Sequence, residues 1–398
     1  MKILYHHRTA SKDGQAVHIE EMIQALRELG HEVCVVGPKV SGKADMGAEV
    51  GWVRQLRDNL PKAVYECLEL GYSALAYLRL ARAAREFKPD VIYERYNLFL
   101  LAGWLLKKRR GLPLLLEVNA PLVDERVRFG GLGLPWLGHW AEGLAWRGAD
   151  VVLPVTHVLA GHVRARGVPH ERIAVIPNGI NEAHFASAPS SADAKAALGW
   201  SGALVLGFTG FVRDWHGVDR VLRWMARDDT PHHARLLVVG DGPARAYLER
   251  LARELAIEDR VHFTGVVPRE QVPGYVASFD IALQPAVVAY ASPLKLFEYL
   301  ALGKAIVAPR QPNIEEILVD GRNAVLFDAS LHGELESALS RLCQDTDLRA
   351  RLAAGAHATI ADLGLTWHKN AQRVVGLATV LSAAHVAEDK ATDPVRLP

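Results

Sequence analysis

Short apolar runs alternate along the first half of the chain with longer stretches of helical spacing. Residues 3–5 form such a run, a polar stretch containing Gly14 follows, and residues 17–29 then carry apolar side chains every three or four positions. Further apolar runs lie at residues 91–93, 114–118, 151–155 and 173–176. This alternation predicts a parallel β-sheet with helices on both of its faces.

The pattern is interrupted at residues 186–202, which are rich in Ala, Ser and Gly, and it then resumes. Apolar runs in the second half lie at residues 204–208, 236–239, 261–263, 281–283, 305–308 and 324–327. We therefore predict two Rossmann-like α/β domains that join near residue 190. Ligands of such sheets bind beyond the carboxyl ends of the strands, so we expect them in the cleft between two facing domains.

Composition and charge exclude several classes of protein. The chain has 398 residues, of which 46 are Lys or Arg and 45 are Asp or Glu, so its formal charge is +1. A near-neutral chain lacks the basic excess that a partner such as nucleic acid requires. The cysteines, Cys34, Cys67 and Cys343, are too few and too widely spaced for a disulfide framework or a zinc site, which favours a reducing compartment.

The sequence contains neither the pattern of a membrane span nor that of a signal peptide. Met1 and Lys2 lead directly into an apolar run, without the long apolar core of a leader. The longest notable apolar run, residues 98–106, falls short of the roughly 20 residues that cross a bilayer. We expect a cytoplasmic protein that at most lies on the inner face of the plasma membrane.

Residues 292–303 carry the most informative pattern of the chain. Ser292 fits the N-cap of a helix and Pro293 its first position. Lys295 and Glu298 lie three residues apart on one face, away from the apolar stripe. Free N–H groups and Lys295 would bind a phosphate, and Glu298 would accept hydrogen bonds from a diol such as ribose. A surface helix with an internal ion pair is the other interpretation.

Residues 208–219 carry a second pattern that suits an anion. They read as the end of a strand, a glycine turn at Gly210 and the start of a helix. Arg213 follows the carboxyl end of the first strand of the second domain, where a guanidinium group can clamp a diphosphate. Taken alone, an arginine in such a position is more often a solvated loop charge.

Together with other motifs of the chain, these two patterns follow an order and spacing similar to those of the retaining GT-B glycosyltransferases of family 4, also called glycosyl transferases group 1. The matching segments are the Gly14 loop and residues 30–33, 149–151, 176–181 and 185 in the first domain, and residues 210–217, 238–243, 261–265, 280–282 and 292–303 in the second. The resemblance covers most of the chain.

The resemblance implies a GT-B fold, in which two Rossmann-like domains face each other. An acceptor-binding domain would occupy residues 1–188 and a nucleotide-sugar-binding domain residues 189–365. A helix over residues 366–386 would cross back to the first domain, and residues 387–398 would form a flexible tail.

The resemblance also assigns roles to individual residues. Arg213 and Lys295 would hold the diphosphate of the donor and Glu298 its ribose, which makes these three the expected catalytic residues. Further donor contacts would come from Gly14, Gly210, His216, Val266, Val267, Ser292, Pro293 and Leu294. Acceptor contacts would come from His18, Asn119 and Tyr290.

Several positions depart from the family's pattern or fit a second interpretation. His216 stands where many members have a lysine, and Tyr290 where they have the first of two paired glutamates. Asn119 lies in the segment where the family's frequent acceptor-side histidine is replaced, and it fits a turn residue equally well. His18 matches a recurrent position of the family and equally fits a half-buried helix histidine.

The resemblance implies a retaining hexosyltransferase with no cofactor and no obligatory metal. It would move a sugar from a nucleotide-sugar donor to a glycan or lipid-linked acceptor, in cell-surface polysaccharide or glycolipid biosynthesis. Arg213 and Lys295 would stabilise the negative charge that develops on the leaving diphosphate. A nucleotide-sugar epimerase of the same fold and a non-catalytic nucleotide-sugar-binding module remain as alternatives.

The sequence contains one candidate for peripheral contact with an anionic membrane. Residues 98–106 are apolar and residues 107–110 are four cations, a combination that would suit a lipid surface. A packed helix with a solvated basic end is the commoner arrangement in parallel-sheet domains. Arg126, Arg128 and Phe129 would shape an acceptor entrance, contact lipid or form plain surface.

Overall fold

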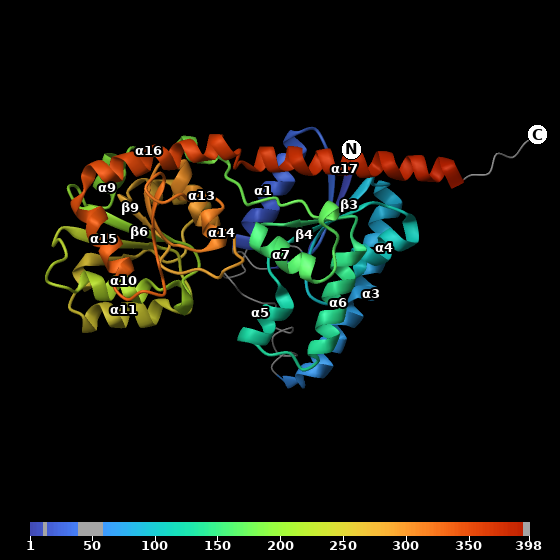
Figure 1. Cartoon of the computed structure of the whole chain (residues 1–398), viewed down its shortest axis with the longest axis horizontal. Coiled ribbons are helices and arrows are strands. Elements are labelled where there is room, and N and C mark those ends of the chain that lie inside the picture. Colours follow the sequence, from blue (N-terminus) through green and yellow to red (C-terminus); the bar gives the residue numbers. More distant parts are fainter. Residues whose placement is uncertain (11–13, 39–58, 393–398) are drawn as a thin grey trace, which may run out of the picture. The chain divides into compact units, whose positions relative to one another are not determined.

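The computed structural model describes residues 1–10, 14–38 and 59–392, and it falls into two compact units (Figure 1). Unit 1 consists of Met1–Pro177 with Trp367–Pro398, and unit 2 of Asn178–Thr366. Each unit contains a parallel β-sheet covered by helices, as the alternation of apolar runs predicts.

The sheet of unit 1 has parallel strands in the order β2-β1-β3-β4-β5. They are β1 (Lys2–His6), β2 (Glu32–Val36), β3 (Val91–Arg95), β4 (Leu114–Val118) and β5 (Val151–Pro154). The predicted strand at residues 173–176 does not form, and only an isolated bridge joins Ile173 to Val152. Pro154 has no N–H group to donate to this segment, so the ladder stays incomplete.

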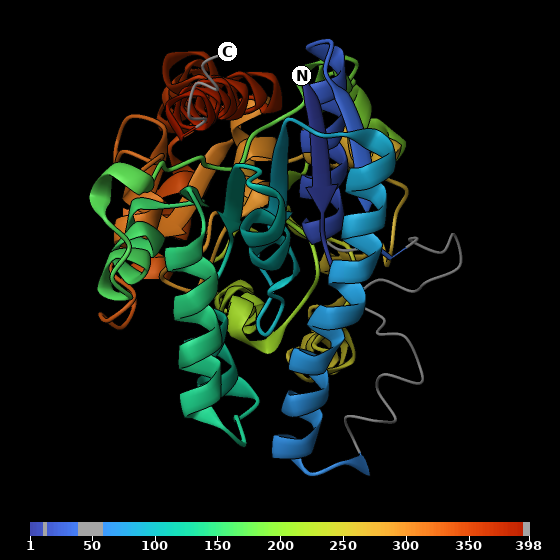
Figure 2. The ribbon, with the colours of Figure 1, turned by 90° about the vertical axis from the view of Figure 1, so that its right-hand side faces the viewer.

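Helices cover the sheet of unit 1, and two of them, α3 and α6, extend well beyond it (Figure 2). The helices are α1 (Gly14–Glu28), α3 (Lys62–Phe87), α4 (Ala102–Arg110), α5 (Leu122–Phe129), α6 (Pro135–Gly148), α7 (His157–Ala165) and α17 (Trp367–Thr392), with a 3₁₀ turn, η1, at His170–Arg172.

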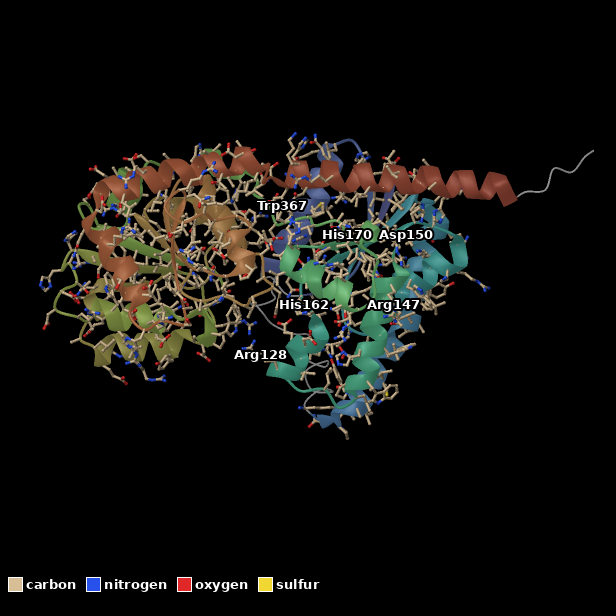
Figure 3. All side chains as sticks on the ribbon, viewed as in Figure 1. Arg128, Arg147, Asp150, His162, His170 and Trp367 are labelled. Carbon is tan, nitrogen blue, oxygen red and sulfur yellow. The ribbon has the colours of Figure 1, made fainter. Side chains whose placement is uncertain are left out.

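The C-terminal helix α17 returns to unit 1 and packs against α1. The ring of His18 in α1 meets that of Trp367 edge-on, with centroids 4.8 Å apart (Trp367 is labelled in Figure 3). The side-chain amide of Asn370 donates to the carbonyl oxygen of Pro177 at 2.6 Å. The helix continues to Thr392, past its predicted end at residue 386, and residues 393–398 lie outside the described residues.

The apolar segment before α4 is packed inside unit 1. Leu98 and Phe99 are fully buried and form a core cluster with Val123 and Leu137. Leu106 is buried as well, so the segment offers little apolar surface to a membrane, and the packed-helix interpretation is the one that the structure shows. None of the helices in the described ranges is long and apolar enough to cross a bilayer.

The sheet of unit 2 has parallel strands in the order β11-β10-β9-β6-β7-β8. They are β6 (Leu204–Thr209), β7 (Ala234–Val239), β8 (Val261–Phe263), β9 (Ile281–Leu283), β10 (Ala305–Pro309) and β11 (Ala324–Phe327). Each predicted apolar run of the second half therefore forms a strand.

Helices and 3₁₀ turns connect the strands of unit 2. The helices are α8 (Glu182–Ala186), α9 (Ser191–Ala197), α10 (Val218–Met225), α11 (Arg245–Glu254), α12 (Val272–Ala277), α13 (Leu294–Ala301), α14 (Pro312–Glu315), α15 (Glu334–Gln344) and α16 (Thr346–Leu363), and the turns are η2 (Asp214–His216), η3 (Glu258–Arg260) and η4 (Arg269–Gln271).

Successive residues of β6 enter different core clusters, because side chains of a strand point alternately to its two faces. Leu206 packs in one cluster with Trp224 of α10, and Val205 packs in the other with Phe297 of α13. Burial on both faces fixes the register of β6 and hence the place where its carboxyl end meets the loops.

Residues 178–188 belong to unit 2, whereas we expected the boundary to follow residue 188. Ile180 and Phe185 lie in the core cluster of Phe297, and Ile180 forms a parallel bridge with Thr366. The boundary set by contacts therefore follows Pro177.

Substitution of Gly242 tests how closely the loops of unit 2 pack. A Cβ at this position would lie 2.2 Å from the carbonyl oxygen of Val212, a backbone atom with little freedom to move. We expect Gly242→Ala to lower the free energy of unfolding by about 1–3 kcal/mol, as overpacking does. Gly274→Ala is the control, because nothing lies within 4 Å of that Cβ. Equal melting temperatures for the two variants would contradict this packing.

Candidate functional site

The loops after β6 and β7 lie against each other at the carboxyl edge of the unit 2 sheet. Gly210 has a φ of +116° and Gly240 a φ of +132°, conformations that favour glycine. A Cβ on Gly240 would lie 2.2 Å from the carbonyl oxygen of Gly210. The N–H of Val212 donates to the carbonyl oxygen of Asp241 at 2.9 Å. This close approach fixes the backbone that carries Arg213.

His216 lies in the 3₁₀ turn η2, directly after Arg213, and it is buried. The backbone N–H of Arg213 donates to Nδ1 of His216 at 3.1 Å, so the neutral ring carries its proton on Nε2. Burial, together with the charges of Lys295 and Arg213, lowers the pKa of His216 to about 2. The residue that replaces the family's usual lysine is therefore a neutral hydrogen-bond donor.

Lys295 lies in the first turn of α13, with its side chain against the end of β6. Its Nζ is 3.7 Å from the centroid of the Phe208 ring, and the His216 ring lies 5.3 Å from the same ring. Burial lowers the pKa of Lys295 to about 7, although the charge of Glu298 opposes the shift. The ammonium group is therefore partly dehydrated, and its contact with the face of the Phe208 ring compensates only part of the lost hydration free energy.

Arg213 and Lys295 form no ion pair with a carboxylate within the described part of the chain. The guanidinium group of Arg213 is exposed and lies 4.7 Å from the centroid of the Phe211 ring. Both cations lie close enough to His216 to lower its pKa. Two cations near one neutral ring, neither in an ion pair with a described carboxylate, are suited to a ligand with two negative charges.

Glu298 follows Lys295 by one turn of α13 and is held by β6. Oγ1 of Thr209 donates to Oε2 of Glu298 at 3.1 Å, and the N–H of Thr209 donates to the hydroxyl oxygen of Tyr299 at 3.0 Å. Burial raises the pKa of Glu298, against the hydrogen bond from Thr209 and the charges of Lys295 and Arg269. Its second carboxylate oxygen remains able to accept a hydrogen bond from a ligand.

Sequence reasoning missed Arg269, whose charge acts on Glu298. Arg269 opens η4, and its carbonyl oxygen lies 3.2 Å from Nε2 of His184. The sequence offered one signal for it, since Arg269 follows Pro268 immediately after the loop at Val266 and Val267.

Ser292 and Pro293 lack the predicted capping arrangement. Helix α13 begins at Leu294, and its N-cap position falls on Pro293, which has no side-chain donor or acceptor. The Ser292 hydroxyl accepts instead from the N–H of Asn178 at 3.4 Å, and the Ser292 carbonyl accepts from the Asn178 side-chain amide at 2.6 Å. The first amides of α13 thus have no side-chain cap, which suits an anion.

The loop after β8 joins the same edge of unit 2. Gly265 forms a bridge with Gly240, which brings this loop to the loop after β7. Val266 is 57% exposed, whereas Val267 packs against the core cluster of Phe297. Tyr290 is half-buried in the turn before α13.

The remaining predicted site residues belong to unit 1. Nε2 of His18 lies 3.0 Å from Oε2 of Glu117, and the side-chain amide of Asn119 donates to Oε1 of Glu117 at 2.6 Å. His18 is buried in a helix, whereas Asn119 is half-buried beyond the end of β4. Sequence reasoning missed Glu117, because it lies inside an apolar run. Gly14 is the exposed first residue of α1, and residues 11–13 of its loop lie outside the described residues.

The basic residues near α5 differ in their surroundings. Arg126 forms an ion pair with Glu69, with 2.6 Å between Nη1 and Oε2. Arg128 is exposed at the surface of α5 (Figure 3). The side chain of Phe129 lies outside the described part of the structure.

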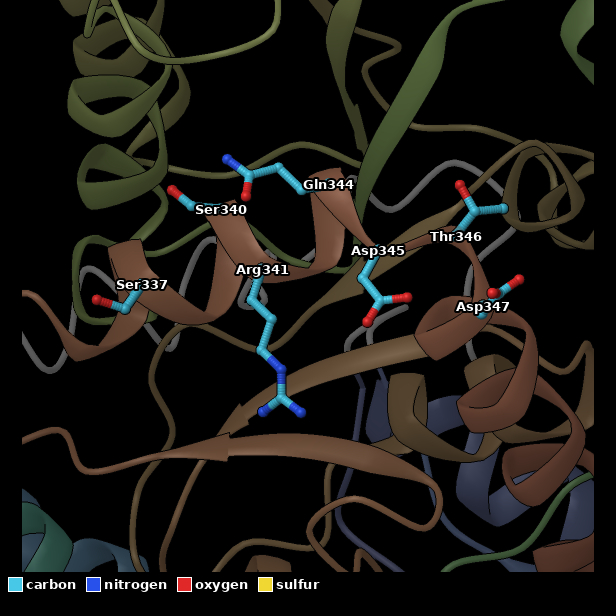
Figure 4. A pocket seen from close by; sticks show the side chains of 7 residues that line it. All are labelled: Ser337, Ser340, Arg341, Gln344, Asp345, Thr346 and Asp347. Carbon is cyan, nitrogen blue, oxygen red and sulfur yellow. The ribbon is translucent and has the colours of Figure 1, made fainter.

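The surface hollows of unit 2 include the following two. One, of about 680 Å³, is lined by polar side chains at the junction of α15 and α16 and contains none of the predicted site residues (Figure 4). There Asp345 already accepts a hydrogen bond from the N–H of Leu348 at 2.7 Å. The other, of about 390 Å³, is lined by Arg213, Asp219 and Tyr247 among others.

Two family models match the chain. The one described as a glycosyl transferase 4-like domain matches residues 13–179, and the one described as glycosyl transferases group 1 matches residues 203–345. Similar curated proteins include a D-inositol 3-phosphate glycosyltransferase of Xylanimonas cellulosilytica, which is 27% identical over 89% of this chain and 89% of its own. The lipopolysaccharide core biosynthesis glycosyltransferase LpsD of Rhizobium meliloti is 26% identical over 90% of this chain and 93% of its own.

Solved structures with the same fold are GT-B glycosyltransferases. Anabaena Alr3699/HepE in complex with UDP matches with a TM-score of 0.75 and 20% identity, covering 96% of this chain and 100% of that one. Sucrose-phosphate synthase from Thermosynechococcus elongatus matches with a TM-score of 0.78 and 18% identity, also covering 96% of this chain and 100% of that one.

The titration of two lysines tests the anion site. Lys295 has its pKa lowered to about 7, and burial lowers the pKa of Lys304 to about 8. Lys304 already donates to the carbonyl oxygen of Ala277 at 2.7 Å, so it serves as the internal control. In ¹³C-lysine NMR, sulfate should raise the midpoint of Lys295 and leave that of Lys304 unchanged, because an anion favours the charged form. Lys295→Arg and Lys304→Arg assign the resonances, and equal shifts of both would contradict the site.

Proposed function

Because the chain belongs to the GT-B glycosyltransferases of group 1, we propose that it is a retaining family 4 enzyme that moves a hexose from a nucleotide-sugar to a glycan or lipid-linked acceptor. The reaction would serve cell-surface polysaccharide or glycolipid biosynthesis and require neither a cofactor nor an obligatory metal. The observation that carries the proposal is that Arg213 and Lys295 both lie near the neutral ring of His216, and that neither forms an ion pair with a carboxylate in the described ranges.

Breaking a sugar–phosphate bond leaves negative charge on the diphosphate and positive charge at the anomeric carbon. Arg213 and Lys295 would stabilise the first of these charges, and they would do so strongly because Lys295 is poorly hydrated. The Nε2–H of His216 would add a hydrogen bond without adding charge. A similar protein, Anabaena Alr3699/HepE, has been solved with UDP-glucose.

The rest of the nucleotide would lie along the carboxyl edge of the unit 2 sheet. Glu298 would accept hydrogen bonds from the ribose hydroxyls, with its other oxygen held by Thr209. The backbone at Val266 and Val267 would face the base. Closer to the diphosphate, the remaining donor contacts would come from Gly14, Gly210, Ser292, Pro293 and Leu294.

We assign the acceptor to polar groups at the carboxyl edge of the unit 1 sheet. Asn119 would contact an acceptor hydroxyl directly, since it is half-buried beyond the end of β4. His18 is buried, so it would act through its contact with Glu117. Tyr290, in place of the family's first paired glutamate, would add an aromatic contact to a sugar.

Transfer is tested by incubating the protein with a panel of nucleotide-sugars and with glycan or lipid acceptors. Release of nucleoside diphosphate should depend on the acceptor, and ¹H NMR of the product should show the anomeric configuration of the donor. Conversion of the donor to an isomer without an acceptor would identify an epimerase instead. Binding without turnover would identify a non-catalytic module.

The donor site is tested by Arg213→Ala and Glu298→Ala. Each should reduce kcat/KM by about 10²–10³-fold, the range found when a group that stabilises transition-state charge is removed. Arg250→Ala is the matched control, because this exposed arginine of α11 donates only to the carbonyl oxygen of Ala246 among the described residues. Wild-type activity in the first two variants would remove the assignment.

A cytoplasmic enzyme that uses a lipid-linked acceptor would also rest on the anionic inner face of the plasma membrane. Because the segment at residues 98–106 is mostly buried, we propose α6 as the candidate surface in its place. Trp136 and Trp140 lie one turn apart on this helix and are 67% and 49% exposed, and the adjacent α5 exposes Arg128. Tryptophan and arginine side chains favour the interface of an anionic membrane.

Sedimentation with lipid vesicles tests this surface. We expect the protein to bind vesicles that contain phosphatidylglycerol and to bind pure phosphatidylcholine weakly. The double variant Trp136→Ala/Trp140→Ala should lose most of this binding, whereas Trp215→Ala, which alters an exposed tryptophan of unit 2, should keep it. Retention of binding by the double variant would exclude α6 as the contact.

A further inference from the structure

A buried carboxylate at the edge of the unit 1 sheet is surrounded by four polar side chains. The Glu117 side chain is 3% exposed. Its Oε2 accepts from the hydroxyl of Tyr93 at 2.6 Å and lies 3.0 Å from Nε2 of His18. Its Oε1 accepts from Nη1 of Arg95 and, at 2.6 Å, from Nδ2 of Asn119. Both oxygens of the carboxylate therefore already have partners within unit 1.

Glu117 stays ionised in this environment. Burial alone would raise its pKa, but the charges of His18 and Arg95 and the hydrogen bonds from His18 and Tyr93 hold the pKa well below its usual range. An ionised carboxylate only accepts hydrogen bonds. The group of Asn119 that faces it is therefore the NH₂ and not the carbonyl.

The orientation of the Asn119 carboxamide follows from this contact. With Nδ2 directed to Glu117, Oδ1 lies in the same plane on the other branch of the carboxamide group and points away from Glu117. Oδ1 forms no hydrogen bond with any described residue, and Asn119 is half-buried rather than enclosed. Rotation of the amide by 180° would set two acceptors, Oδ1 and Oε1, against each other and is disfavoured.

We propose that Glu117 is a positioning residue that presents Oδ1 of Asn119 as a hydrogen-bond acceptor for a neutral hydroxyl group of the sugar or polyol that receives the transferred hexose. The proposal rests on the transfer function proposed above. Because Oδ1 of Asn119 accepts a hydrogen bond, it favours a hydroxyl group, which can donate one, over a phosphate or carboxylate oxygen, which cannot. This preference for a hydroxyl group over an anionic group depends on Glu117, although Glu117 does not contact the substrate.

A double-mutant cycle with a neutral glycoside as the acceptor, beginning with octyl glucoside and methyl hexosides, tests the proposal. Asn119→Ala should raise the KM for the acceptor by up to about tenfold, the effect of one lost uncharged hydrogen bond. The KM for the donor should not change. Glu117→Gln should raise the acceptor KM similarly, because a glutamine amide no longer requires Nδ2 of Asn119 to face it.

The combination of the two substitutions separates positioning from a structural role. If Glu117 acts through Asn119, then Glu117→Gln in the Asn119→Ala background should leave the acceptor KM unchanged. Glu142→Gln is the matched control, since Glu142 is another buried carboxylate of unit 1 that binds a tyrosine and an arginine. It should lower the melting temperature without raising the acceptor KM selectively.

Additive effects of the two substitutions, or an equal rise of the donor and acceptor KM, would overturn the proposal while leaving the transfer function intact. Absence of acceptor-dependent release by the wild type would overturn both. If Glu117→Gln does not fold, NMR of the wild type decides: the Nδ2 protons of Asn119 should exchange slowly with solvent. Fast exchange would contradict the orientation.

Discussion

The site of unit 2 depends on two positive charges near His216, neither of which forms an ion pair with a carboxylate of the described residues. Lys295 lies against the face of Phe208, and Arg213 leaves the same strand end on a backbone fixed by the approach of Gly240 to Gly210. Burial removes hydration from the ammonium group of Lys295 and lowers its pKa, which is a cost to the protein without a ligand. An anion that bridges the two cations would relieve the cost.

At the carboxyl edge of the unit 1 sheet, by contrast, the buried charge is neutralised by side chains of the same unit. There the buried carboxylate of Glu117 is compensated by Arg95 and His18 and accepts hydrogen bonds from Tyr93 and Asn119. A cluster of this kind needs no ligand, and it rigidifies the groups around it. We propose that one edge binds the charged leaving group and that the other holds a neutral group in a fixed orientation.

The sequence predicted the parts of this structure that depend on local pattern. Apolar runs located each strand of unit 2, and the spacing of Lys295 and Glu298 located α13. Contacts distant in sequence decided the rest. Leu98 and Phe99 are buried because Val123 and Leu137 pack on them, and Ser292 is not a cap because Asn178 takes its hydroxyl. Glu117 lies within an apolar run, and the sequence offers no sign of its polar surroundings because its partners come from β3 and α1.

A crystal structure of the protein with a bound nucleotide-sugar would test the central claim most directly. We expect the diphosphate oxygens within about 2.7–3.2 Å of Nζ of Lys295 and of the Arg213 guanidinium group, with the ribose hydroxyls on Glu298. A diphosphate bound elsewhere, for example in the hollow at α15 and α16, with Lys295 still facing only Phe208, would contradict it.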